Sequence, residues 1–413
     1  MFTLMSSHVR TYLAKWSASW QSLCAAPTPP ALVELTVNRS RTALAAGLLA
    51  AVLGLTACGG SASSSGSSDS KAATAKSAAD LGGMDALVAA AKAEGALNVI
   101  TLPHTWANYG AILDGFKAKY GLKINESNPD GTSQDEINAV KQLKGQDRAP
   151  DVLDLGSSFA LSAAAGGLLA PYKVATWKDI PDAQKDADGR WYNDYGGYIS
   201  IGYDAAKVPN PPTSFADLAK PEYKGKVALN GDPTKAGAAF AGVYAAALAK
   251  GGSFDNIQPG IDFFGELHRN GNFIPVGATQ ATIQSGQTPI TIDWDYLQVS
   301  ASKTLAGKVD WKVAVPTDGH YANYYNQAIS ASAPHPAAAR LWQEYLYSAE
   351  GQNLYLKGSA RPVTLAAMQA AGTVDKTALE ALPKVTGEAS FPSEKQLDAA
   401  KKVIADSWAK TVG

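Results

Sequence analysis

The sequence is poor in cysteine. It has only two in 413 residues, Cys24 and Cys58. Both precede the region that we expect to fold, so that region has no thiol and cannot form a disulfide. Its stability must come from packing, which a chain of this length can supply.

Charge of one sign is also lacking. The 36 Lys and Arg residues are balanced by 37 Asp and Glu residues, which leaves a formal net charge of −1. A protein that binds nucleic acid needs a basic excess to attract the phosphates. The balance therefore gives no electrostatic reason to expect a nucleic-acid partner.

Common hydrolase motifs are absent as well. The chain has no Gly-x-Ser-x-Gly and no His-Glu-x-x-His, and its five histidines show no spacing typical of metal ligands. We therefore expect no enzyme, no catalytic residue, no metal and no cofactor. A secreted hydrolase is the alternative from another functional class.

The apolar run at 43–55 is too short to cross a membrane. It has 13 residues, whereas a membrane-spanning helix needs about 20. The run follows Arg39 and Arg41 and precedes small residues, which is the plan of a secretory signal. The alternatives are an ordinary signal that is followed by Cys58 only by chance, or a buried helix.

The end of this run, Leu55-Thr56-Ala57-Cys58, resembles the lipobox of bacterial lipoproteins. The resemblance implies that the signal is cut before Cys58 and that this cysteine carries the lipid. The protein would then lie outside the cytoplasm, anchored to the outer face of the cell membrane.

The residues on either side of this motif fit such an anchor. Residues 58–80 are mostly Ser, Gly and Ala and predict a flexible tether. Residues 1–57 are assigned to an N-terminal extension and the signal. One hypothesis is that translation starts at Val37, which would make residues 1–36 an artefact of the gene boundary.

Helices and short apolar strands alternate after the tether. The first expected helices are 84–94, 108–120, one opened by a capping box at 133–136, and 156–169, and the strands are 97–102, 122–125 and 151–155. This alternation predicts an α/β fold with a parallel sheet.

A second group of elements follows an irregular aromatic stretch. The expected strands are 199–204, 226–230, 288–292, 311–315 and 325–331. The expected helices are 214–219, 232–250, 262–268, 279–285, 336–357 and one that begins at 393. Because Asp232 and Pro233 stand at N-cap and first-turn positions, the long helix is expected to start there.

Several of these segments resemble a known family. They are 97–101 after the opening helix, 199–204, 214–227, and 326–332 followed by 333–352. Together they are similar to extracytoplasmic solute-binding proteins of ABC importers, in the group that includes ferric-ion, polyamine and aminoethylphosphonate binders. The likeness extends over residues 81–368.

The resemblance implies a fold and a mechanism. The fold is the two-lobed, type II periplasmic-binding-protein-like α/β fold with strands crossing between the lobes. Lobe one would comprise 81–200 and 321–413, and lobe two 201–320. A monomer would close on a small molecule by hinge motion and deliver it unchanged to a membrane permease.

Candidate ligand contacts lie just past the expected strands. In lobe one they are Trp106, Tyr109 and Ser157, with Tyr195 from the aromatic stretch. Trp106 could instead be a core residue, and Ser157 could instead cap a helix.

In lobe two the candidates are Asp232 and the cluster Asp293-Trp294-Asp295-Tyr296, with Tyr324 near the return strand. Two carboxylates beside an indole suit an organic cation, because acids pair with ammonium groups and the ring face attracts positive charge. The alternative is that the acids cap a turn, the indole packs inward and Asp232 caps a helix.

Ferric binders of the resembled family hold iron partly through adjacent tyrosines. This chain has only Tyr296 at the corresponding place, and Tyr324 and Tyr325 come later. We therefore predict a small organic cation such as a polyamine, with ferric ion as the alternative and a phosphonate or another anion third.

Overall fold

A computed structural model of the protein describes residues 71–385 and 391–413, and these belong to one structural unit. The predicted extension, signal and lipidation site at Cys58 lie outside the described residues, as does most of the tether. Within the described ranges, no helix combines the length and the apolar character that a membrane span requires.

The first part of the chain alternates as predicted. Its elements are η1 (Ala78–Leu81), α2 (Met84–Glu94), β1 (Ala96–Ile100), α3 (Tyr109–Tyr120), β2 (Lys123–Ser127), α4 (Ser133–Gln142), β3 (Val152–Gly156), α5 (Ser157–Ala165) and β4 (Leu169–Ala170). Helices α2 and α3 end at Gly95 and Gly121, both left-handed, because glycine adopts that conformation without steric cost. We call this group, together with the later α10, the first lobe.

A second group of elements follows, which we call the second lobe. The chain enters it by β5 (Tyr192–Asp204) and leaves it by β9 (Ala322–Ser330). Between them lie the short turns η4 (Ala216–Ala219) and η5 (Pro221–Tyr223), then β6 (Val227–Leu229), α6 (Gly237–Ala249), α7 (Gln258–Arg269), α8 (Gln280–Ser285), β7 (Ile290–Trp294), α9 (Asp295–Thr304) and β8 (Trp311–Ala314). Two more short turns, η2 (Trp177–Asp179) and η3 (Asp182–Gln184), precede β5.

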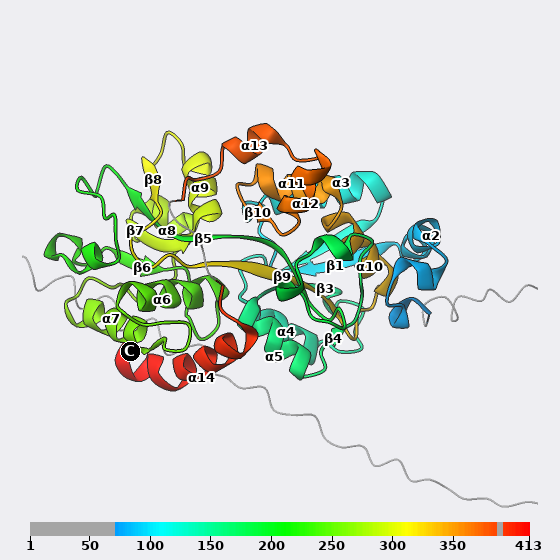
Figure 1. The fold of residues 1–413 in the computed structure, drawn as a ribbon, viewed down its shortest axis with the longest axis horizontal. Helices are drawn as coiled ribbons and strands as arrows, with labels where there is room; N and C mark the ends of the chain where they lie inside the picture. The colour runs from blue at the N-terminus through cyan, green and yellow to red at the C-terminus, as the bar shows by residue number, and fades with distance from the viewer. Residues whose placement is uncertain (1–70, 386–390) are drawn as a thin grey trace, which may run out of the picture. The chain divides into compact units, whose positions relative to one another are not determined.

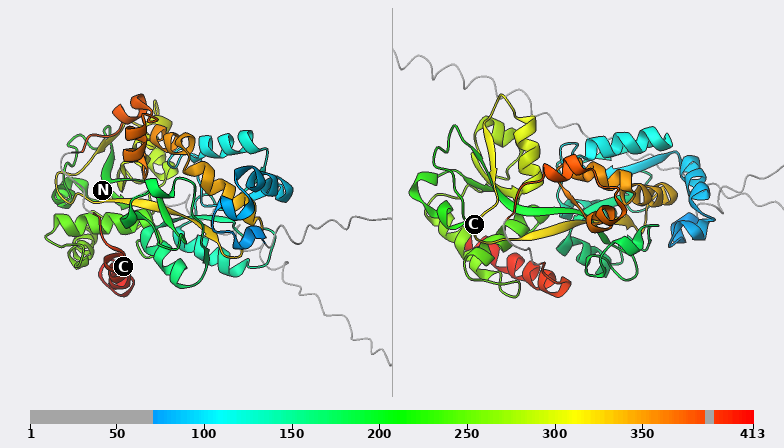
Figure 2. Two further views of the ribbon diagram at one scale, coloured as in Figure 1. Left: turned by 45° about the vertical axis from the view of Figure 1, so that its right-hand side comes forward. Right: turned by 45° about the horizontal axis from the view of Figure 1, so that its top comes forward.

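The C-terminal part is helical. It comprises α10 (Pro336–Leu346), α11 (Ala349–Lys357), β10 (Arg361–Pro362), α12 (Leu365–Ala371), α13 (Lys376–Glu380) and α14 (Glu394–Thr411). Helix α14 starts at the predicted Ser393–Gln396 capping box and packs against α5 of the first lobe and α7 of the second. Figures 1 and 2 show it along one side of both groups.

Strands β5 and β9 run antiparallel beside each other and pass between the two lobes (Figure 1). The long sheet has the order β3-β9-β5-β7-β6. β9 pairs with β3 and β4, whereas β5 pairs with β7 and β8. The α/β class and the crossing strands are thus as predicted, and the lobe boundaries at 200 and 320 remain predictions.

The predicted parallel sheet is only partly correct. β1 pairs parallel with β2, and β6 with β7, but all pairs of the two crossing strands are antiparallel. A strand that returns from the second lobe beside the strand that entered it must run in the opposite direction. Both crossing strands are also longer than predicted, since their aromatic and amide residues hid the pattern.

Several predicted helix boundaries are wrong, and three of these errors have an identifiable local cause. The capping box of α4 is Thr132 with Asp135, so Ser133 and Glu136 are free for contacts inside the protein. Helix α6 begins at Gly237, because Asp232 instead forms a turn with Thr234. The predicted helix 336–357 is two helices, because Ser348 caps a new start at α11.

Candidate ligand-binding cleft

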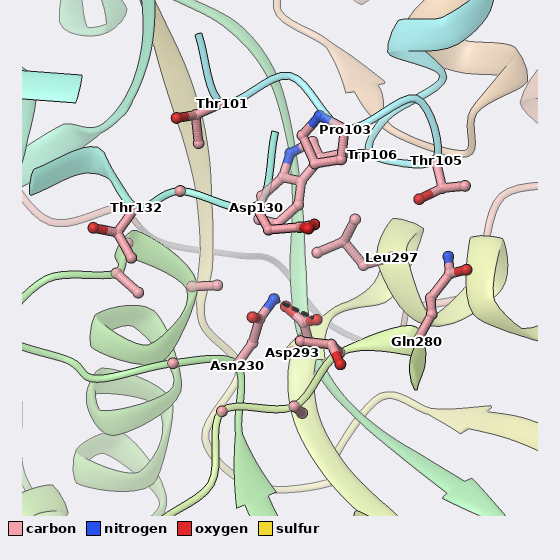
Figure 3. A pocket seen from close by; sticks show the side chains of 18 of the residues that line it. Thr101, Pro103, Thr105, Trp106, Asp130, Thr132, Asn230, Gln280, Asp293 and Leu297 are labelled. Carbon is pink, nitrogen blue, oxygen red and sulfur yellow. Dashed lines mark hydrogen bonds between the residues drawn. The ribbon is translucent and has the colours of Figure 1, made fainter. Parts of the chain in front are cut away.

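A cavity of about 550 Å³ lies between the ends of strands from the two lobes. This volume falls within the range of sites for small molecules. Figure 3 shows side chains from both lobes facing it. On the first-lobe side, the lining comes from the loops after β1 and β2, from the start of α4 and from β3. On the second-lobe side, it comes from the loop after β6, the start of α6, the loop before α8, and β7 and α9.

Two buried carboxylates from the first lobe line the cavity, Glu136 on α4 and Asp154 on β3. Glu136 Oε2 accepts the backbone N–H of Asp154 at 2.9 Å. Asp154 Oδ2 accepts the hydroxyl of Tyr195 at 2.7 Å. The remaining oxygens, Glu136 Oε1 and Asp154 Oδ1, are buried and have no hydrogen-bond partner in the protein. Each of these two acids therefore carries one buried oxygen that no protein group satisfies.

A third buried carboxylate, Asp293 at the end of β7, lines the opposite side. Its Oδ2 accepts from Asn230 Nδ2 at 2.8 Å, and its Oδ1 accepts its neighbour's backbone N–H. Figure 3 shows Asn230 and Asp293 side by side below Trp106. This pair offers both an acid and an amide to a bound molecule.

No lysine, arginine or histidine is among the described residues that line the cavity. Burial raises the pKa of Asp293 to about 7. It also raises the pKa of Asp154, and it raises that of Glu136 well above its usual value, with the charge of Asp154 adding to the effect. Because buried charges need a partner, the cleft is electrostatically suited to a cation.

Aromatic rings form one wall of the cavity. Trp106, in the loop after β1, meets Tyr325 of β9 edge to face at a centroid distance of 5.6 Å. The indole Nε1 of Trp106 donates to the Tyr195 hydroxyl at 2.6 Å. The face of such a ring attracts a cation, so the wall and the carboxylates favour the same kind of ligand.

The two lobes touch at the rim of the cavity. Ser300 Oγ on α9 donates to the Thr105 carbonyl at 2.7 Å, and the Gln134 N–H donates to the Lys235 carbonyl at 3.3 Å. Nearby, a Cβ on Gly156 would come within 3.0 Å of Gly237 Cα. Glycine at both positions permits this close approach of β3 and α6.

The structure places two of the predicted contact residues, Trp106 and Asp293, in the cavity lining. Four others are buried in the aromatic core and do not line it: Tyr109, Tyr195, Trp294 and Tyr296. The cluster at 293–296 was expected to be a loop after a strand. It is instead the end of β7 and the start of α9, which turns its rings inward.

The remaining predicted contacts have other surroundings. Ser157 donates to the Tyr324 carbonyl, and both residues line small crevices apart from the cavity. Asp232 holds its own turn and pairs with Lys235. Asp295 is fully buried and forms an ion pair with Arg361 at 2.6 Å. Ligand contact by these residues remains a prediction that their positions do not support.

Sequence reasoning missed Glu136, Asp154 and Asn230. Asp154 interrupts the apolar strand Val152–Gly156, and a polar residue inside a buried strand was the signal that could have found it. Glu136 was assigned to a capping box and therefore appeared to be satisfied locally.

The fold and cleft agree with comparisons to known proteins. The sequence profile of the family described as bacterial extracellular solute-binding protein matches residues 147–390, which is more than half of the chain. The chain belongs to this family. The predicted resemblance to solute-binding proteins is thereby confirmed, and this membership supports a binding role rather than a catalytic one.

Curated relatives match part of the chain. The thiamine-binding periplasmic protein of Brucella suis biovar 1 (strain 1330) is 31% identical over 156 residues, covering 36% of this chain and 45% of that protein. The probable ABC transporter periplasmic-binding protein y4fP of Sinorhizobium fredii is 28% identical over 158 residues, covering 37% and 42%. The chain thus spans less than half the length of these relatives.

Solved structures share the fold. The periplasmic binding protein AfuA from Actinobacillus pleuropneumoniae, with fructose-6-phosphate bound, has a TM-score of 0.60 at 18% identity and covers 77% of this chain and 98% of its own. Iron-bound HitA from Pseudomonas aeruginosa has a TM-score of 0.53 at 19% identity, with coverages of 77% and 99%. At these identities the likeness establishes the two-lobed α/β fold and no ligand.

The ion pair of Asp295 and Arg361 yields a prediction about stability. Replacing Asp295 by Ala leaves the largely buried Arg361 guanidinium without its carboxylate, which should cost about 3 kcal/mol or more of unfolding free energy. Urea unfolding would measure this, with Asp232→Ala, at a half-exposed turn, as the control. Wild-type stability combined with lost ligand affinity would instead place Asp295 in the site.

Proposed function

We propose that the protein captures a small organic cation in the cleft between its lobes and delivers it, unchanged, to the permease of an ABC importer. The observation that carries the proposal is the set of three buried carboxylates, Glu136, Asp154 and Asp293, in a cavity whose described lining has no basic residue. A cation would supply the missing positive charge.

Two further points support a nitrogen cation. Trp106 offers an aromatic wall beside the acids, which suits a charged ring or an ammonium group. The curated relatives from Brucella are named as thiamine-binding proteins. The class we propose includes thiamine-like ring cations and polyamines, since both present positively charged nitrogen.

Ferric ion is the rival ligand, as in the structural neighbour HitA. The adjacent Tyr324 and Tyr325 do not converge, since side chains alternate along β9 and only Tyr325 lines the cavity. Among residues 71–385 and 391–413, no group of three or more His, Cys, Asp or Glu side chains is arranged to hold a metal. These positions favour an organic cation over bare iron.

A binding screen tests the proposal. We expect thiamine or spermidine to raise the melting temperature of the purified protein and to give a measurable Kd by calorimetry, whereas ferric citrate and fructose 6-phosphate should not. Asp293→Asn should weaken the cation at least roughly tenfold, because it removes a charge-assisted contact. Asp232→Asn, outside the cavity, should bind like the wild type. Stabilisation by ferric citrate alone would overturn the proposal.

The raised pKa values give a pH dependence. Because burial raises the pKa of Asp293 to about 7, its carboxyl binds more protons in the folded than in the unfolded state between about pH 4 and pH 7. The unfolding free energy of the free protein should therefore fall as the pH rises through this window. Cation affinity should rise over the same window as the carboxylate forms.

Chemical denaturation and calorimetry at pH 5.5, 6.5 and 7.5 would measure both trends. Asp293→Asn should reduce the slope of both trends, while the raised pKa values of Asp154 and Glu136 leave a remainder. A cation affinity that does not change with pH would contradict the assignment of buried acids to the site.

We also propose that Cys58 carries the lipid that anchors the protein to the outer face of the cell membrane. The lipobox-like sequence that ends at Cys58 and the Ser/Gly/Ala tether after it support this proposal. Cys58→Ser should move the protein from the detergent-soluble membrane fraction to the aqueous fraction in a phase-partitioning assay. Unchanged partitioning of this variant would contradict it.

A further inference from the structure

Tyr195 lies at the centre of the site without lining the cavity. It is fully buried on β5 and is absent from the cavity lining. Its ring stacks on Tyr325 at 5.8 Å with an interplanar angle of 3°, and on Tyr355 at 4.6 Å. Packing against these two rings restricts the orientation of its own ring.

The hydroxyl of Tyr195 joins two groups that do line the cavity. It accepts from Trp106 Nε1 at 2.6 Å and donates to Asp154 Oδ2 at 2.7 Å. A hydroxyl has one proton to donate. Since that proton goes to Asp154, the Tyr195 oxygen must act as the acceptor for Trp106. The aromatic wall and the carboxylate are thereby held at a set spacing.

The same bond leaves one particular oxygen of Asp154 free. Because Tyr195 donates to Oδ2, the other oxygen of Asp154, Oδ1, is the one that has no hydrogen-bond partner in the protein. Without the Tyr195 hydroxyl, the Asp154 carboxyl group would lose the hydrogen bond that holds its orientation.

The backbone around Tyr195 is irregular in a way that suits this task. The register between β5 and β9 shifts between Asn193 and Gly196, so that β5 carries one extra residue there. A β-bulge of this kind re-aims a side chain and is frequent next to functional sites. Tyr195 falls within the bulge.

We propose that Tyr195 is a positioning residue for ligand capture: it holds the Trp106 indole and the Asp154 carboxylate in the arrangement that receives the cation, without touching the cation itself. This inference rests on the proposed binding of an organic cation in the same cleft.

The groups around Asp154 determine what loss of the hydroxyl would do. The titratable groups that interact electrostatically with Asp154 are all acids or phenols. They are Glu136 on α4, Asp194 and Tyr195 on β5, Tyr109 on α3, Tyr296 on α9, Tyr325 on β9, Tyr347 after α10 and Tyr355 on α11. No basic group is among these described neighbours. The Tyr195 hydroxyl lowers the pKa of Asp154 against the effect of burial.

The test compares Tyr195→Phe with Tyr355→Phe. Both remove one buried hydroxyl from stacked rings, but the Tyr355 hydroxyl contacts Asp194 and Tyr109 rather than the cavity groups. With thiamine and spermidine as probes, Tyr195→Phe should raise Kd at pH 7 roughly tenfold or more, since a hydrogen bond to a charged group is lost. The pH at which affinity is half-maximal should move upward. Tyr355→Phe should leave that midpoint unchanged.

A double-mutant cycle separates positioning from general destabilisation. In an Asp154→Asn background, Tyr195→Phe should cause a smaller further loss of affinity than in the wild type, because one of the two groups that it positions is already changed and only Trp106 remains. Equal Kd values and pH midpoints for Tyr195→Phe and Tyr355→Phe, or additive effects in the cycle, would overturn the proposal.

These outcomes are distinct from failure of the proposed function. If neither cation binds the wild-type protein, the organic-cation proposal fails, and the role of Tyr195 fails with it. If the cations bind and the two tyrosine variants behave alike, only the role of Tyr195 fails. Melting curves of all variants without ligand would verify that each is folded.

Discussion

The antiparallel pairing of β5 with β9 is the constraint on which the rest of the structure depends. The two strands pair with each other over part of their length. Beyond that part, β9 pairs with β3 and β5 pairs with β7. The crossing therefore fixes where the ends of β1, β3, β6 and β7 can meet. It also carries Tyr325, which lines the cavity, and Tyr195, which stacks on Tyr325, so the same two strands that connect the lobes support the aromatic wall. The same part of the sheet thus connects the two lobes and supports one wall of the cavity.

The cleft differs from the rest of the molecule in its charge balance. Over the whole sequence, positive and negative residues cancel almost completely. Outside the cavity, the buried acids Asp295 and Asp151 have a basic partner, Arg361 or His335, whereas the buried Asp194 accepts from a backbone N–H and the Tyr355 hydroxyl. Around the cavity this compensation is missing, and two carboxylate oxygens have no protein partner. Net charge could not have revealed this, because the imbalance is local and arises only when residues distant in the sequence are brought together.

The sequence predicted those features that depend on residues close together in the chain better than those that depend on residues far apart in it. Helices with local signals, such as the one opened by Ser393 and the one ended by Gly95, were predicted to within a residue. The parallel sheet was a wrong prediction because the direction of the crossing strands depends on tertiary pairing, whereas the helix break at Ser348 has a local capping signal that was overlooked. The same division applies to the site. Trp106 and Asp293 follow strands and were found from position alone. Glu136 and Asp154 were not, because a capping pattern and an apolar strand are each complete local explanations. Asp295 shows the converse case, since a plausible ligand carboxylate is used by an arginine 66 residues away.

The uncompensated acids have a physical cost that explains their place in the fold. Burial of a carboxylate without a counter-charge opposes folding, and here it is expressed as raised pKa values in Glu136, Asp154 and Asp293. A sequence under selection for stability alone would remove these acids or pair them. Their presence together in one cavity follows the general rule that functional sites depart from the pairing of buried charges. A cation that enters the cleft reverses the cost, since it replaces lost hydration with direct contacts. Because the acids come from both lobes, a ligand of the proposed cationic class would make all these contacts only when the lobes are together, and its charge would thereby favour the closed arrangement over an open one.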